Sequence, residues 1–178
     1  MKRYLLGMFL FVMLSFGLND SRPEAKTQKE NIVYADQVSW TEDGFAKVYV
    51  RIRNNQGMMG YRIHIRYDSS QIEVKKISQG GIMNQGIFQD NLGQKDGAVD
   101  VLWSGTEDMK KNGVLFSLSV QSKQKKQKEA VIHLSSSQED TFNEKWEDVE
   151  LHCNLIRIDG KSSPQSTSKP EQKNEETK

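Results

Sequence analysis

Cysteine is almost absent from this 178-residue sequence, in which Cys153 is the only one. A single thiol excludes an internal disulfide and a cysteine-based metal cluster. An excess of one charge is also missing, because 25 lysines and arginines face 24 aspartates and glutamates. Such a balance produces no global field that would attract nucleic acid or an anionic membrane, so we expect neither as a partner.

Long apolar runs are missing except at the N-terminus. Lys2 and Arg3 precede a nearly uninterrupted apolar run from Leu5 to Leu18, which is the layout of a secretory signal and too short to span a bilayer comfortably. Small residues allow cleavage between Gly17 and Ala25, so we assign residues 1–25 to a signal peptide and 26–31 to a short polar linker. We therefore expect a secreted, extracellular protein without membrane contact once the signal is removed.

Aliphatic and aromatic residues are absent from the other end of the chain, Lys161 to Lys178. A segment without such side chains has nothing to bury, so we expect residues 160–178 to be a disordered polar tail. Residues 32–159 remain between the two ends, which is enough for one ordinary core. The sequence therefore predicts a single domain with two polar flanks.

Within that domain, apolar residues alternate with polar ones, and no amphipathic run is long enough for a substantial helix. Alternation turns successive side chains to opposite faces of a strand. The residues expected to point inward are the alternate ones within Val48 to Ile52, Tyr61 to Tyr67, Val99 to Trp103, Val114 to Val120, Ile132 to Leu134, and Val149 to Cys153. Half-buried strands without a helix to cover them need a second sheet. We therefore predict an all-β domain of two packed sheets.

Turn residues separate these strands at the spacing typical of a sandwich. They are Asp43-Gly44, Asn54 to Gly57, Gly80-Gly81, Asp96-Gly97 and Asn112-Gly113. Many short strands divided between two layers give a β-sandwich or a jelly roll.

Four stretches of the chain, taken in order, resemble the cohesin family. They are DGFAKVYVRI (Asp43 to Ile52), GMMGYRIHIRYDSSQIEVKKISQGG (Gly57 to Gly81), NGVLFSLSVQSK (Asn112 to Lys123) and LHCNLIRI (Leu151 to Ile158). They are similar to the family's alternating valine strand, its strand with Tyr-Asp and a turn, its Gly-x-Leu-Phe strand and its closing strand. The resemblance covers about Ile32 to Asp159 and depends on the order and spacing of the pieces.

The resemblance implies a two-sheet β-sandwich with jelly-roll topology and about nine strands. It also implies no catalysis, and binding of dockerins, which are calcium-loaded helical pairs carried by enzymes that degrade plant polysaccharides. No cofactor is then expected in this chain, and calcium is expected on the partner. The family's contact positions correspond here to Gly60, Arg62, His64, Arg66, Gln89, Asn91, Asp100, Leu102 and Ser104.

Arg62 departs from the family's pattern, because cohesins tend to have hydrogen-bond acceptors early on this strand. An arginine only donates and is always charged, so its partner should supply acceptors or acids. The partner is then a divergent dockerin or another protein. Alternation independently turns Arg62, His64, Arg66, Asp100, Leu102 and Ser104 to solvent.

Other polar residues are interpreted more simply. The three histidines, His64, His133 and His152, fall on different strands without ligand spacing, so we expect no metal site. Adjacent acids point apart on a strand, so we interpret the pairs Glu107-Asp108, Glu139-Asp140 and Glu147-Asp148 as turn and surface charge without glycosidase chemistry. The lysines from Lys123 to Lys128 are typical of a solvated loop, and Cys153 of a buried apolar thiol.

A carbohydrate-binding module of the same sandwich fold is the alternative function, with a polysaccharide as ligand. Such modules expose a planar strip of aromatic rings. Alternation turns only Tyr49 outward with certainty, whereas Trp40 and Trp146 lie near strand ends and Tyr61, Tyr67 and Trp103 belong to the predicted core. Protein docking is therefore the preferred function, and the exposure of the aromatic rings distinguishes the two.

Overall fold

A computed structural model describes residues 29–83, 85–124 and 129–160 of the chain. The predicted signal peptide at 1–25 and the tail from 161 onward lie outside the described residues. The same holds for residues 125–128 of the lysine-rich loop.

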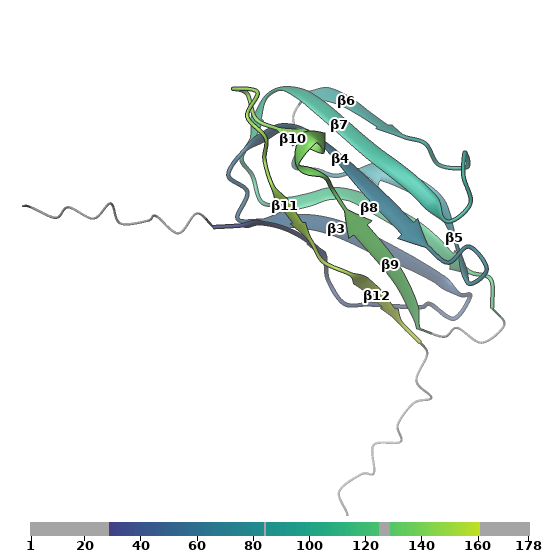
Figure 1. The fold of residues 1–178 in the computed structure, drawn as a ribbon. Coiled ribbons are helices and arrows are strands. Elements are labelled where there is room, and N and C mark those ends of the chain that lie inside the picture. The colour runs from purple at the N-terminus through teal and green to yellow at the C-terminus, as the bar shows by residue number, and fades with distance from the viewer. Residues whose placement is uncertain (1–28, 84, 125–128, 161–178) are drawn as a thin grey trace, which may run out of the picture.

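Two sheets stacked face to face make up the domain, with the seven-stranded sheet in front in Figure 1. The five-stranded sheet contains, in spatial order, β11 (Leu151–Cys153), β1 (Asn31–Ala35), β3 (Phe45–Arg53), β8 (Gly113–Ser122) and β5 (Ile72–Gln79). The other contains β2 (Val38–Ser39), β12 (Ile156–Asp159), β9 (Ala130–Ser135), β4 (Met58–Tyr67), β7 (Ala98–Met109) and β6 (Gly86–Asp90), with β10 (Thr141–Phe142) paired to β4.

These elements confirm the predicted all-β sandwich. Twelve strands are present in the described residues, and the nine that have four residues or more match the expected number. The three shorter ones, β2, β10 and β11, are held by pairing with longer neighbours. A single turn of 3-10 helix, η1 (Gln138–Asp140), precedes β10.

The core lies between the sheets and consists of the residues that alternation turned inward. Val48, Val50 and Ile52 of β3 are buried, as are Tyr61 of β4 and Trp103 of β7. Strand breaks fall at each of the five predicted turns. Alternation therefore predicted the dry face of β3, β4 and β7, whereas at the start of β8 Leu115 is buried and Val114 is only half-buried.

One predicted strand is divided between the two sheets. Leu151 to Ile158 was expected to close the domain as a single strand, but β11 pairs with β1 in one sheet and β12 pairs with β9 in the other. The buried residue of β11 is odd-numbered (Leu151), whereas those of β12 are even-numbered (Ile156 and Ile158). Odd- and even-numbered residues of one continuous strand point to opposite faces, so a single strand could not bury both groups. The chain therefore leaves one sheet at residues 154 and 155 and crosses to the other.

Candidate partner-binding face

Eight of the nine predicted contact positions lie on three adjacent strands, β4, β7 and β6, with β7 in the middle, and Asn91 directly follows β6. Leu102 of β7 lies opposite Arg62 of β4 on one side and Gln89 of β6 on the other. The next rows bring Asp100 beside His64 and Ser104 beside Gly60. We call this surface the β4–β7–β6 face; it consists of Gly60, Arg62, His64, Arg66, Gln89, Asn91, Asp100, Leu102 and Ser104.

Alternation explains why the side chains of this face point away from the core. Tyr61, Ile63 and Ile65 of β4 are fully buried, so Arg62, His64 and Arg66 between them face outward. On β7, buried Val101 and Trp103 flank half-buried Leu102. Eight of the nine positions are exposed or half-buried, and Gly60 is the buried one.

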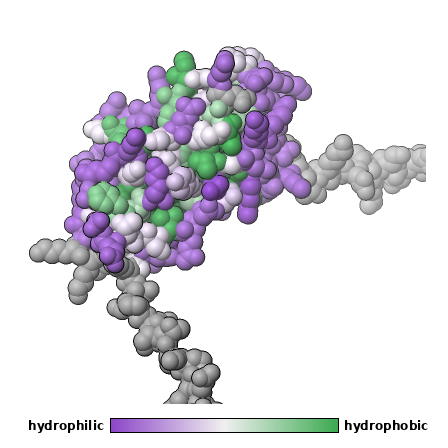
Figure 2. Space-filling model, turned by 180° about the vertical axis from the view of Figure 1, so that it is seen from behind, coloured by the Kyte–Doolittle hydropathy of each residue, from purple (hydrophilic) through white to green (hydrophobic). Residues whose placement is uncertain are grey.

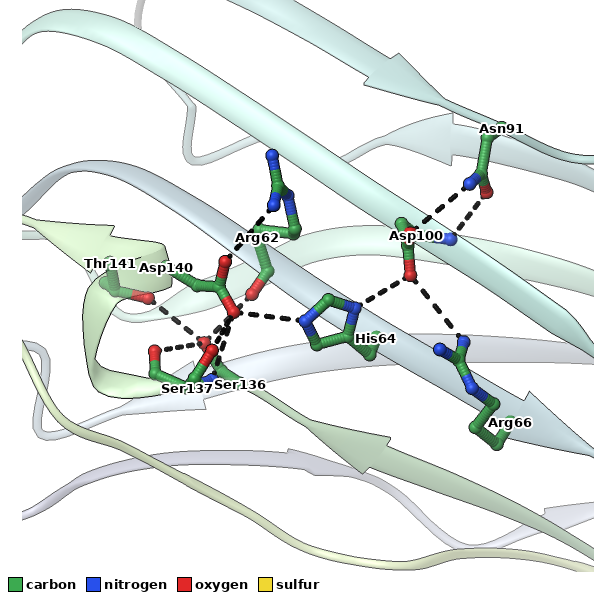
Figure 3. Close-up of polar contacts among 9 residues, drawn as sticks. All are labelled: Arg62, His64, Arg66, Asn91, Asp100, Ser136, Ser137, Asp140 and Thr141. Carbon is green, nitrogen blue, oxygen red and sulfur yellow. Dashed lines mark hydrogen bonds and ion pairs between the residues drawn. The ribbon is translucent and has the colours of Figure 1, made fainter.

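His64 lies at the centre of a polar network (Figure 3). Its Nδ1 is 2.8 Å from Oδ1 of Asp100, and its Nε2 is 3.0 Å from Oδ2 of Asp140. Alternation predicted that Asp100 lies on the same face. Asp140, by contrast, was interpreted as surface charge, and its side chain is only 11% exposed. The interpretation of Glu139-Asp140 as a solvated pair is therefore wrong for Asp140.

The chain around η1 holds Asp140 in place. The backbone N–H of Ser137 donates to Oδ2 of Asp140 at 3.2 Å, and the hydroxyl of Ser137 donates to the same oxygen. Arg62 donates to Oδ1 at 3.4 Å. Burial opposes ionisation, but the hydrogen bonds from Ser137 and His64 outweigh it and hold the pKa of Asp140 below its usual value.

Asp100 is fixed from both neighbouring strands. The hydrogen bond from His64, together with the positive charge of Arg66, holds the pKa of Asp100 below its usual value against the effect of burial. On the β6 side, Oδ1 of Asn91 accepts the backbone N–H of Asp100 at 2.6 Å, and Nδ2 of Asn91 donates to Oδ2 of Asp100 at 3.3 Å. Three of the predicted contact residues are therefore hydrogen-bonded to one another before any partner arrives.

This network changes the expected electrostatics of the partner. Arg62 lies 3.4 Å from Asp140, and Arg66 lies 3.6 Å from Asp100. Each guanidinium thus has a carboxylate beside it, and the charges of the face are balanced. The expectation that the partner supplies acceptors or acids rested on Arg62 alone and did not include the carboxylate beside it.

Gly60 differs from the other positions because the ring of Phe142 covers it. A methyl group at Gly60 would lie 2.6 Å from the Cζ atom of Phe142. β10 pairs directly with this part of β4. A shallow depression of about 220 Å³ lies beside the ring, and Leu102, Ser104 and Phe142 are among the residues that line it. Phe142 and Asp140 are thus parts of the face that the family's contact positions did not include.

The remaining candidate residues have simple structural roles. Within residues 29–83, 85–124 and 129–160, no three histidine, cysteine or acidic side chains come close enough to hold a metal ion. His152 lies 3.7 Å from exposed Glu150, and the largely buried carboxylate of Asp108 accepts the backbone N–H of Glu144. Burial raises the pKa of Cys153 to about 11, so its thiol stays protonated at neutral pH.

The aromatic rings that bear on the carbohydrate-binding alternative differ in exposure. Trp40 is buried, and Tyr49 is 45% exposed, as predicted. Trp146 is 75% exposed. The sequence did not predict this exposure, because Trp146 lies near a strand end, where alternation gives no clear direction. Phe45 and Tyr49 both belong to β3, whereas Trp146 follows β10 at the other sheet.

Known proteins with this architecture were found by sequence and by structure. A family model described as Cohesin domain matches residues 42–148. The cohesin of a type I cohesin–dockerin complex from Clostridium thermocellum superimposes with a TM-score of 0.64 at 18% identity, over 74% of this chain and 99% of that one. A non-cellulosomal cohesin from the archaeon Archaeoglobus fulgidus gives 0.64 at 13% identity, over 77% and 94%.

A second type I complex from Clostridium thermocellum contains a cohesin that gives a TM-score of 0.62 at 21% identity, over 76% of this chain and 96% of that one. No curated protein sequence matches this chain. Within the described residues there is no helix with the length and hydropathy needed to span a bilayer. The family model covers more than half of the sequence, and the chain belongs to the cohesin family.

Proposed function

We propose that this chain is a secreted, non-catalytic module that docks a dockerin-bearing protein through the β4–β7–β6 face. Family membership supports the protein-binding part, because the similar Clostridium thermocellum cohesins are described in complexes with dockerins. The apolar run at Leu5 to Leu18 supports export. The bound protein would be an enzyme of polysaccharide degradation.

The arrangement around Leu102 is the observation that carries this proposal. A half-buried leucine lies between Arg62 and Gln89 on a sheet face where His64, Asp100 and Asn91 are already joined by hydrogen bonds. Interfaces concentrate their energy in an apolar centre with a polar rim. Side chains that are fixed before binding lose less conformational entropy in the complex.

Calcium enters this proposal only through the partner. Dockerins are expected to fold around calcium, so a chelator should abolish docking by unfolding the partner. This chain should keep its own fold under the same treatment. Thermal unfolding of the purified domain with and without chelator provides the control.

The test compares two leucine variants. Leu102→Asp places an unpaired charge at the centre of the face, and we expect it to weaken dockerin binding by about 2 kcal/mol or more, which is roughly thirtyfold. Leu155→Asp is the matched control, because Leu155 is 50% exposed and lies between β11 and β12, away from the face. Calorimetry with a panel of purified dockerins measures both, and circular dichroism checks the folds.

One outcome would replace docking by the alternative function. If Leu102→Asp binds normally while Tyr49→Ala loses affinity for a polysaccharide, the chain is a carbohydrate-binding module. Tyr49 is the appropriate probe because its ring is exposed on β3, on the sheet opposite the β4–β7–β6 face.

A further inference from the structure

The turn from Asn143 to Glu147 presents the most exposed large hydrophobic side chain of the described residues. Trp146 is 75% exposed, whereas the two other tryptophans of the chain, Trp40 and Trp103, are buried. A large ring left in water gains no stabilisation from burial, so its position calls for another explanation.

The turn holds Trp146 in a defined position. The carbonyl of Asn143 accepts the N–H of Trp146 at 3.0 Å, and Oδ1 of Asn143 accepts the N–H groups of Lys145 at 2.9 Å and Glu147 at 3.0 Å. Nδ2 of Asn143 donates to the Glu147 carboxylate at 2.8 Å. Trp146 itself has φ of 63°, a conformation that bulky residues rarely adopt.

Phe142 supports the indole from one side. The two rings are stacked, with centroids 5.2 Å apart and an angle of 11° between their planes. One face of the indole is therefore covered by Phe142. Because Trp146 is 75% exposed, its other face is open to solvent. A fixed ring with one open face is a binding surface whose ordering entropy is already lost in the free protein.

The chain segment that carries this ring is rich in acids. Residues 138–150 contain six acids, one of which is Asp140 beside Arg62, and a single base, Lys145. Asp108 of β7 adds a carboxylate from another strand: it accepts the N–H of Glu144 at 2.8 Å and lies 3.9 Å from the ammonium group of Lys110. The face of an indole attracts cations, and nearby carboxylates strengthen that attraction. The chemistry therefore fits a positively charged group.

Trp146 also adjoins the proposed docking surface. Phe142, on which it stacks, covers Gly60 at the edge of the β4–β7–β6 face. β10 and the turn after it lie at one end of the sandwich (Figure 1). A protein docked on the face can therefore reach the open side of the indole.

We propose that Trp146 and the carboxylates around it bind a lysine or arginine side chain of the docked protein. This inference rests on the proposed function and adds the chemistry of a second contact, beside the apolar centre at Leu102. It reverses the sign expected from Arg62, since the partner supplies a cation at this end of the interface.

The observations favour a cation over a saccharide. Sugar-binding surfaces stack on several coplanar rings, whereas the other exposed rings, Phe45 and Tyr49, lie on β3 of the opposite sheet. Seen from behind, on the side of the five-stranded sheet, apolar patches are separated by hydrophilic side chains (Figure 2). Trp146 therefore stands apart from any aromatic platform.

A titration of the isolated protein tests the cation directly. The three indole N–H signals are followed by NMR while N-acetyl-arginine amide is added, with N-acetyl-citrulline amide as the neutral isostere and cellohexaose as the saccharide. We expect a saturable shift of the Trp146 signal with arginine only. An equal response to citrulline, no response to arginine, or a response to cellohexaose would overturn the proposal.

Docking variants test the same contact in the complex. With a dockerin that binds the wild-type chain, Trp146→Ala should lower the affinity about tenfold and Trp146→Phe should lower it less. Glu147→Gln keeps the acceptor for Asn143 and should reduce the salt dependence of binding. If Leu102→Asp abolishes docking but Trp146→Ala leaves affinity unchanged, the cation site is wrong and the docking face stands. If Leu102→Asp has no effect, the docking face itself is wrong.

Discussion

The imidazole of His64 bridges carboxylates from two elements that are distant in sequence, Asp100 on β7 and Asp140 on η1. Each ring nitrogen thus lies within hydrogen-bonding distance of one carboxylate oxygen. Alternation could place His64 and Asp100 on one face, because both belong to long strands. It could not place Asp140, whose position depends on a chain reversal after β9 that has no periodic signal.

Acid titration of stability tests the role of Asp140. Its pKa is lowered in the folded protein, so its contribution is complete above the unfolded pKa of about 3.9 and is lost as the pH falls through the folded value. Asp140→Asn should therefore be less stable than wild type at pH 7, and the difference should shrink below about pH 4. Urea unfolding at several pH values measures this, with Glu139→Gln, at the exposed neighbouring acid of η1, as the control. A difference that is constant with pH would contradict it.

At the scale of elements, the long strands were predictable and the short ones were not. β3, β4, β7 and β8 have eight residues or more, and alternation is clear over such lengths. β10 has two residues and exists because Thr141 pairs with Tyr61 and Phe142 with Gly60. A strand that is defined by its partner leaves no pattern of its own, so Phe142 and Trp146 were missing from the predicted site.

The contact between β4 and β10 gives a prediction at this scale. Gly60→Ala places a methyl group 2.6 Å from the Phe142 ring, so the ring must shift, and we expect a loss of about 1–3 kcal/mol from overpacking. In a Phe142→Ala background the same methyl group has room, and the loss should be small. The double-mutant cycle from urea unfolding should therefore show coupling of about 0.5–3 kcal/mol. Equal losses in both backgrounds would mean that Phe142 does not press on Gly60.

At the scale of the whole molecule, the last segment joins the two sheets. β11 extends the five-stranded sheet beside β1, and two residues later β12 enters the other sheet between β2 and β9. Asn154 at the crossing donates its N–H to the carbonyl of Val33 at 2.8 Å. The change of sheet is visible in the sequence only in the apolar residues, which are odd-numbered in β11 (Leu151) and even-numbered in β12 (Ile156 and Ile158).

Two truncations test where the domain ends. Residues 161–178 contain no aliphatic or aromatic side chain, so a chain that stops after Gly160 should keep its melting temperature within about a degree or two. A chain that stops after Cys153 loses Ile156 and Ile158, both buried, and leaves β9 paired with β4 alone. Burial of two isoleucines contributes about 2–5 kcal/mol each, a large part of the stability of a domain of this size. We therefore expect the shorter chain to lose cooperative unfolding, and a drop of ten degrees in the longer one would show that its tail packs on the sandwich.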